Sequence, residues 1–149
     1  IGTGTLTLSG SGEFFGDRVN INAGTIRVAD DGTAIGHSDN FESLYINSGG
    51  TLEIYGVDVN DGVNSSREII LNGGTLLGTN DGVNDASLLD DMSLLFDASS
   101  NINASAGTVF TVSAEFDNGF NGFDLTTGGA GTVLVTADND FNFDGRPSM

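Results

Sequence analysis

The feature that most constrains this chain is a three-residue phrase, Gly-Thr followed by an aliphatic residue, which occurs six times. The six copies are Gly4-Thr5-Leu6, Gly24-Thr25-Ile26, Gly50-Thr51-Leu52, Gly74-Thr75-Leu76, Gly107-Thr108-Val109 and Gly131-Thr132-Val133. Their threonines are separated by 20, 26, 24, 33 and 24 residues. A short alternating strand that ends in Asn precedes several copies, and a second strand follows. Repetition at such a period indicates a stack of similar structural units.

One unit with two or three short strands cannot bury its apolar side alone, so the copies must pack on one another. We expect each unit to form one coil of a parallel β-helix, with strands of successive coils paired about 4.8 Å apart. The crossover rule makes the coil right-handed. The sequence therefore predicts an all-β fold in which residues 1–149 form a single β-helical repeat domain. This right-handed parallel β-helix (solenoid) has about six to seven coils and is roughly 30 Å long.

Equivalent residues of successive coils should lie above one another. The aliphatic residues of the phrase are then expected to form an inward apolar ladder, and the asparagines before it a stack at one corner, with amides bonded from coil to coil. The predicted apolar ladder consists of Leu6, Ile26, Leu52, Leu76, Val109 and Val133, and the asparagine stack of Asn22, Asn47 and Asn72. The glycines would let the chain turn at positive φ.

The pattern loosens in the second half of the chain. Seven of the ten Phe residues lie at or after Phe96, which indicates aromatic packing in a wider core or at the end of the stack. An exposed aromatic platform for carbohydrate is the alternative interpretation. The longest interval contains "ASLLDDMSLLFDAS", in which Leu88, Met92 and Leu95 fit helical spacing while "MSLLFDA" fits a strand. We favour a loop followed by a strand.

Charge excludes several classes of partner. Four cationic side chains, all Arg, stand against 21 carboxylates, for a net charge of −17. Such a surface repels nucleic-acid phosphates and anionic lipid headgroups, so we expect no nucleic-acid partner. No run approaches the ~20 apolar residues of a membrane span, so we expect no membrane insertion. The absence of cysteine excludes disulfides and thiolate metal sites.

The segment "GTGTLTLSGSGEFFGDRVNINAGTIRVADDGTAIG" resembles the autotransporter-associated β-strand repeat, also called the passenger-associated transport repeat. The matching positions are Leu6-Thr7-Leu8, Gly10, Phe15-Gly16, Ile21-Asn22, Gly24-Thr25-Ile26 and Ile35-Gly36. The close match covers about 32 residues, from Gly4 to Gly36. It departs at Phe14-Phe15-Gly16, where the family usually has Tyr-Thr-Gly. The resemblance implies a right-handed β-helix in a large exported surface protein of a Gram-negative-type bacterium. We therefore expect an extracellular or cell-surface location, and expect this chain to be a segment of a longer exported protein.

Residues that could carry catalysis are few. The single histidine, His37, is followed by Ser38 and Asp39, and consecutive side chains cannot converge into a nucleophile, base and orienter. Carboxylates occur in the pairs Asp30-Asp31 and Asp90-Asp91 and in the cluster Asp138, Asp140 and Asp144. Polysaccharide-cleaving β-helices use converging Asp residues with cationic partners, which are scarce here. We therefore expect a protein that is not an enzyme.

Calcium is the candidate ligand that the sequence favours most. Asp140, Asn142 and Asp144 alternate along the chain before Gly145, as in the first half of a calcium loop, although the carboxylate of the twelfth position would fall beyond Met149. Oxygen side chains also gather around Asp58, Asn60 and Asp61, and around Asn80, Asp81 and Asp85. The same residues are ordinary turn formers, so calcium is a candidate and no cofactor is required.

These observations leave two classes of function open. The leading hypothesis is a non-catalytic structural module, a passenger, stalk or filament-forming solenoid that associates end to end or with neighbouring repeats of the same protein. The alternative is a β-helix that binds or cleaves polysaccharide, which would require exposed aromatic side chains in a groove beside converging carboxylates. A narrower hypothesis is folding or assembly triggered by calcium.

Overall fold

The computed structural model describes residues 2–10, 18–30, 43–59, 68–90, 92–117 and 122–136, which form strands and turns without a helix. The strands belong to three sheets, and every pairing within these sheets is parallel. Sheet A contains β1 (Thr5–Ser9), β3 (Gly24–Ala29), β5 (Gly50–Tyr55), β8 (Thr75–Thr79), β11 (Ser100–Ala104) and β14 (Leu125–Gly129). Sheet B contains β2 (Val19–Ile21), β4 (Leu44–Asn47), β7 (Glu68–Asn72), β10 (Ser93–Ala98) and β13 (Glu115–Asp117). Sheet C contains β6 (Asp58–Val59), β9 (Ser87–Leu88), β12 (Val109–Val112) and β15 (Thr132–Val135).

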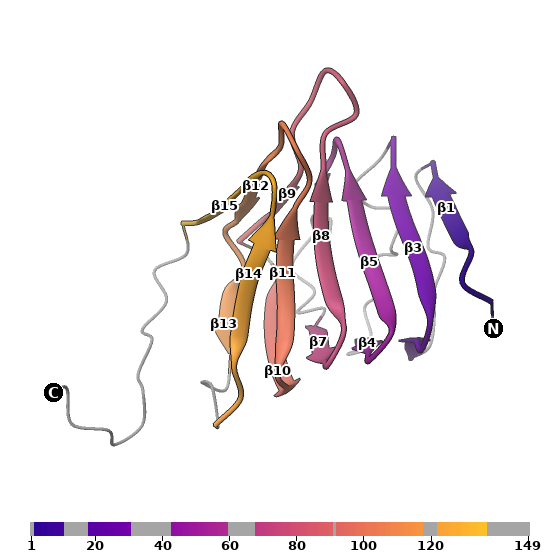
Figure 1. Ribbon diagram of the computed structural model, residues 1–149, viewed down its shortest axis with the longest axis vertical. Helices are drawn as coiled ribbons and strands as arrows, with labels where there is room; N and C mark the ends of the chain where they lie inside the picture. Colours follow the sequence, from indigo (N-terminus) through magenta and orange to yellow (C-terminus); the bar gives the residue numbers. More distant parts are fainter. Residues whose placement is uncertain are drawn as a thin grey trace, which may run out of the picture.

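The chain visits the sheets in the order B, A, C and then begins the next coil. Four coils have a strand in all three sheets: β4–β5–β6, β7–β8–β9, β10–β11–β12 and β13–β14–β15. They give about four turns, and β1 and the pair β2–β3 lie before them. Sheet A runs across the front of the molecule with β1 at one end and β14 at the other (Figure 1). The predicted all-β solenoid of stacked coils is confirmed.

Each copy of the Gly-Thr-aliphatic phrase in the first half of the chain has the same role in sheet A. In a strand, successive side chains point to opposite faces. The threonine therefore faces outward while the following aliphatic residue faces the core. Leu52 pairs with Ile26 on one side and Leu76 on the other, and Leu52 and Leu76 are both fully buried. Leu6 pairs with Ile26 at the end of the row.

The last two copies of the phrase do not continue this row, so the predicted positions of Val109 and Val133 in the ladder are wrong. The strand that pairs with β8 is β11, and Ile102 takes the place above Leu76. Val109 begins β12 and Val133 lies in β15, both in sheet C. Val109 faces outward and is 40% exposed, whereas Val133 pairs with Phe110. Gly-Thr occurs at the start of strands in sheet A and in sheet C. The phrase alone therefore could not show that Val109 and Val133 belong to sheet C.

The correct register also removes the irregular 33-residue interval. Thr75 pairs with Asn101, 26 residues further along the chain, and Asn101 pairs with Thr126. These spacings match those of the earlier coils. The intervening segment contains β9 and then β10, which confirms a strand rather than a helix at Ser93–Ala98. Its core-facing side chains are the buried Leu94 and Phe96, and Leu95 lies on the outer face.

The core is the interior of the stack, filled from all three sheets. Sheet B contributes inward rows such as Ile21, Ile46 and Leu71, and sheet C contributes Val59, Leu88 and Val112.

Aromatic rings fill the later coils. Phe96 and Phe110 are buried, and the Phe96 ring meets that of Phe116 edge to face, with centroids 5.5 Å apart. Phe123 is partly buried against the same cluster. The phenylalanines of the described ranges therefore serve the core, whereas Phe120, Phe141 and Phe143 lie outside those ranges.

Candidate functional site: the contacts between coils and the open end

Asparagine side chains link three successive coils at the corner that follows sheet B. The amide Nδ2 of Asn47 donates to Oδ1 of Asn22 at 2.9 Å, and Nδ2 of Asn72 donates to Oδ1 of Asn47 at 2.8 Å. The row ends there because β10 has a register irregularity between Phe96 and Ala98, which places Ala98 opposite Asn72. Asn22 thus accepts, Asn72 donates and Asn47 does both, so the three predicted residues form one continuous chain of amides.

A second link lies on the outer face of sheet A. Arg27 and Glu53 face each other in register and form a two-pronged ion pair, Nε to Oε2 at 2.9 Å and an Nη to Oε1 at 3.2 Å. Glu53 is only 6% exposed, although it occupies an outward position. The hydrogen bond that Arg27 donates to the Glu53 carboxylate is the main cause that raises the pKa of Arg27. The pair holds adjacent coils together and satisfies a buried carboxylate.

Both arginines of the described ranges also stack on tyrosines of the following coil. The guanidinium of Arg27 lies 4.6 Å from the ring centroid of Tyr55, and that of Arg18 lies 4.9 Å from the ring centroid of Tyr45. These distances are those of cation–π contacts. One face of each tyrosine ring, which could have been offered to a sugar ring, is therefore covered by a cation of the chain itself.

Many other polar side-chain contacts span one coil as well. Ser43 donates to Glu68, Ser87 to Asp58, and the hydroxyls of Ser113 and Thr136 lie 2.7 Å apart. Their sequence separations of 25, 29 and 23 residues are each about one coil. Contacts between coils are thus a recurrent use of the polar side chains on the outer surface.

The loop between β8 and β9 is held by its own polar groups. It rises above sheet A in Figure 1 and includes Asn80, Asp81 and Asp85. Asp81 accepts from the backbone N–H of Val83 and of Asn84, both at 2.7 Å. These bonds, that of Asn84 first, lower the pKa of Asp81. Asp85 accepts from the Asn80 amide at 3.2 Å and from the Val109 N–H at 3.0 Å. These oxygens therefore have the contacts of turn formers.

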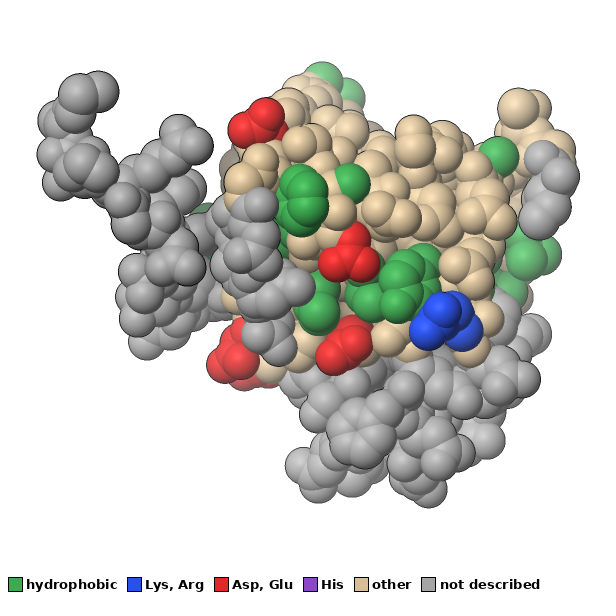
Figure 2. All heavy atoms as spheres, turned by 90° about the horizontal axis from the view of Figure 1, so that it is seen from below, with side chains coloured by type: hydrophobic (Ala, Val, Ile, Leu, Met, Phe, Trp, Pro, Cys, Tyr) green, Lys and Arg blue, Asp and Glu red, His purple; other side chains and the backbone are tan. Residues whose placement is uncertain are grey.

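Acidic groups stand apart from one another in the described ranges. No three of their His, Asp or Glu side chains come close enough together to hold a metal ion. Seen from below in Figure 2, the acidic side chains are distributed over the face, and a cationic side chain lies beside apolar ones. Of the predicted residues, the calcium candidates Asp140, Asn142 and Asp144 lie outside the described residues. So do His37, Asp31, Asn60, Asp61, Asp91 and Asp138.

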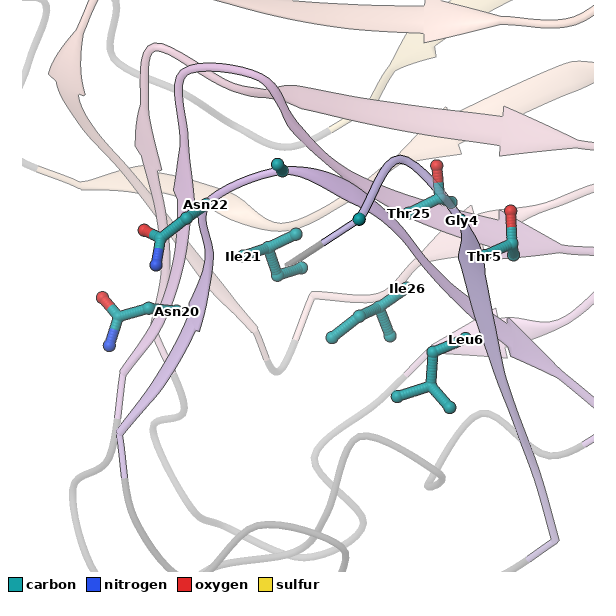
Figure 3. Close-up of a pocket in the computed structure, with 10 residues that line it drawn as sticks. Gly4, Thr5, Leu6, Asn20, Ile21, Asn22, Thr25 and Ile26 are labelled. Carbon is teal, nitrogen blue, oxygen red and sulfur yellow. The ribbon is translucent and has the colours of Figure 1, made fainter.

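An apolar hollow opens where the described coils begin. Its volume is about 420 Å³, and its lining includes Leu6, Ile21, Ile26 and Asn22. Figure 3 shows the three aliphatic side chains directed toward the hollow, while Thr5 and Thr25 point away from it. Leu6 is 56% exposed although it belongs to the core row of sheet A. The hollow lies at the β1 edge of the described coils, where no described strand lies beyond β1.

Sequence reasoning missed the Arg27–Glu53 pair and the two arginine–tyrosine stacks. A signal was present, because Arg27 and Glu53 are 26 residues apart, which is one coil. The sequence left open whether a coil has two or three strands, because the strands of the third sheet are short: β6 and β9 have only two residues each.

No helix in the described ranges is both long and apolar enough to cross a membrane. Comparison with protein-family models, with curated proteins and with solved structures finds no match to this chain.

Proposed function

We propose that this protein is a non-catalytic structural module, a rod of stacked coils that forms part of a bacterial cell-surface or extracellular protein. The observation that supports it best is the use of polar side chains for contacts between coils. The asparagine row, the Arg27–Glu53 pair and the hydroxyl contacts each join neighbouring coils. A surface whose functional groups are engaged in this way is suited to transmitting tension or spacing other domains rather than to turning over a substrate.

The rod is proposed to be right-handed, by the crossover rule for parallel strands. It is proposed to have six to seven coils, with the six strands of sheet A as support. The extracellular location rests on the resemblance of residues 4–36 to the autotransporter-associated repeat. In this function the neighbours of the rod are further repeats of the same protein, or other copies that join it end to end.

The experiment that tests the function compares it with the polysaccharide alternative. The folded chain is mixed with neutral and acidic soluble polysaccharides, and both its melting temperature and the release of reducing ends are measured. We expect no shift in melting temperature and no reducing ends. A reproducible shift would replace the structural proposal with glycan binding, and reducing ends would replace it with glycan cleavage.

Calcium remains a candidate ligand through Asp140, Asn142 and Asp144. Electron microscopy and thermal unfolding with calcium and with chelator test this. If calcium orders the rod or its assemblies, chelation lowers the melting temperature or disperses the assemblies, and sodium does not substitute. Identical results in both conditions leave these residues as turn formers.

A further inference from the structure

We propose that copies of this protein join head to tail through sheet A, with β14 of one copy pairing in parallel with β1 of the next. The inference rests on the proposed structural function and specifies its junction. It follows from a hydrogen-bonding rule that holds inside the stack and that gives complementary groups to the two edges of sheet A beside which no described strand lies.

The rule concerns which backbone groups face which neighbour. In the described coils, the carbonyl of an inward residue accepts from the N–H of an outward residue in the following coil. In sheet A, Ser105 N–H donates to the Gly78 carbonyl at 2.9 Å, and in sheet C, Ser113 N–H donates to the Leu88 carbonyl at 2.8 Å. In a parallel ladder the two groups of one residue bond to the same neighbouring strand. Inward residues therefore bond to the following coil and outward residues to the preceding one.

According to this rule, the two edge strands of sheet A carry backbone groups that could form hydrogen bonds with each other. At β1, the backbone groups of outward Thr5, Thr7 and Ser9 face a side on which no described strand lies. At β14, the groups of inward Leu125 and Thr127 face the other such side. Placed against each other in parallel, the two edges would reproduce the ladder already present between β11 and β14.

The side chains at the two ends are also compatible. The hollow at the β1 end is lined by Leu6, Ile21 and Ile26, and Leu6 is its most exposed apolar group. At the other end, Leu125 and Val133 are only partly buried against the core. Stacking the last described coil of one copy on β1 of another would cover apolar surface at both ends, which favours association. The occupant that fits this end is therefore a second copy of the same chain.

Charge makes the junction dependent on salt. Each copy carries a net charge of −17, so copies repel each other at low ionic strength. The screening length falls from about 10 Å at 0.1 M to about 3 Å at 1 M salt. Association measured by sedimentation velocity should therefore increase with sodium chloride concentration.

Cysteine cross-linking tests the strand pair directly, because the chain has no native cysteine. Thr5 and Thr126 are exposed and occupy one outward row at opposite ends of sheet A. Within one copy they are five strand spacings apart, ~24 Å. A disulfide requires Cα atoms within about 7 Å, so these two positions can be bridged only between copies. In the proposed junction they would be adjacent.

We expect the Thr5→Cys/Thr126→Cys chain, oxidised in 1 M salt, to give a covalent series of dimers, trimers and longer species on a denaturing gel. The matched control is Thr5→Cys/Val109→Cys, because Val109 is exposed on the side of the rod in sheet C. It should give at least ten-fold less of the species longer than dimers. Equal series from both chains, or no species longer than dimers from the first, would overturn the proposal.

A blocking variant supplies an independent check. Thr7→Pro removes an N–H that faces the open edge, a change that edge strands tolerate. In the cross-linking chain it should lower the yield of long species at least ten-fold while the circular dichroism spectrum stays that of the parent. If Thr7→Pro unfolds the chain, Leu6→Lys replaces it, since Leu6 is largely exposed. An undiminished series from a folded blocking variant would overturn the proposal, whereas the structural function is judged separately by the polysaccharide assay.

Discussion

Among single residues, Gly78 lies where a large core side chain leaves no room for a Cβ. Its φ is not positive, so the requirement for glycine here is one of space. A Cβ at this position would lie 2.3 Å from Cγ and 2.5 Å from Cβ of Phe110, which is fully buried in β12. Those atoms are close to the Phe110 backbone and cannot swing away.

We therefore predict that Gly78→Ala lowers the free energy of unfolding by about 1–3 kcal/mol, the usual cost of overpacking a core. Urea denaturation measures the loss. Gly4→Ala is the matched control, because nothing lies within 4 Å of a Cβ built there. In a Phe110→Ala background, which removes the Cγ atom, the cost of Gly78→Ala should be smaller. Equal costs for Gly78→Ala and Gly4→Ala would contradict the prediction.

Asn47 is the middle member of the asparagine row and bonds in both directions. Asn47→Ala would remove two hydrogen bonds and leave two half-satisfied amides, so we predict a loss of about 1–3 kcal/mol in unfolding free energy. Thermal or urea unfolding measures it. Asn101→Ala is the control, since Asn101 is also half-buried on a strand and its side chain has no hydrogen bond to a described residue. A loss no larger than that of the control would show that the row adds no stability.

At the scale of strands and loops, the sequence predicted the kind of element better than its sheet. The tetrapeptide Asn-Ile-Asn-Ala occurs at 20–23 and again at 101–104. The first copy overlaps β2 in sheet B, and the second lies in β11 in sheet A. Ile21 and Ile102 are both buried. Each sheet needs the same alternation of inward and outward residues, so a local pattern cannot say which of the three a strand will join. Only the register of a whole coil decides it.

The loop between β8 and β9 carries a prediction about pH. Backbone N–H groups of Asn84 and Val83 lower the pKa of Asp81 below its ordinary value of 3.8. These bonds are therefore fully present above pH 3.8 and are lost as the pH falls through the lower pKa of the folded state. Amide chemical shifts of Val83 and Asn84, followed by NMR during acid titration, should change with a midpoint below 3.8. A midpoint at or above that of a short peptide with the same sequence would refute the assignment.

For the molecule as a whole, periodicity alone was sufficient to predict an all-β solenoid. Stacking of repeats was the only means of burying six apolar phrases at a period of one coil. The Arg27–Glu53 pair and the contact between Gly78 and Phe110 could not be predicted from the periodicity alone. They depend on which residues of adjacent coils lie opposite each other. In the second half of the chain, the phrase at Gly107 and Gly131 aligned strands of sheet C with strands of sheet A, so the predicted pairs of residues were wrong.

A stacked rod should also open from its ends, because terminal coils have one neighbour and inner coils have two. We predict that the slowest amide hydrogen exchange occurs in β5 and β8, the two central strands of sheet A, and that outward amides of β1 exchange fastest. Hydrogen–deuterium exchange read by NMR measures this gradient. Uniform exchange from β1 to β14 would instead indicate a single cooperative unit.

The contact between Gly78 and Phe110 has a consequence for how such chains diverge. The two residues belong to different sheets and to successive coils. Gly78 has no side chain because the ring of Phe110 fills the space where one would lie. Side chains from different sheets therefore share the interior volume of the stack, and the size of a side chain need not be conserved along one row. In related sequences, a larger side chain in one sheet should therefore be accompanied by a smaller one in another sheet. A consensus sequence derived by aligning single coils would treat such compensating substitutions as loss of the repeat.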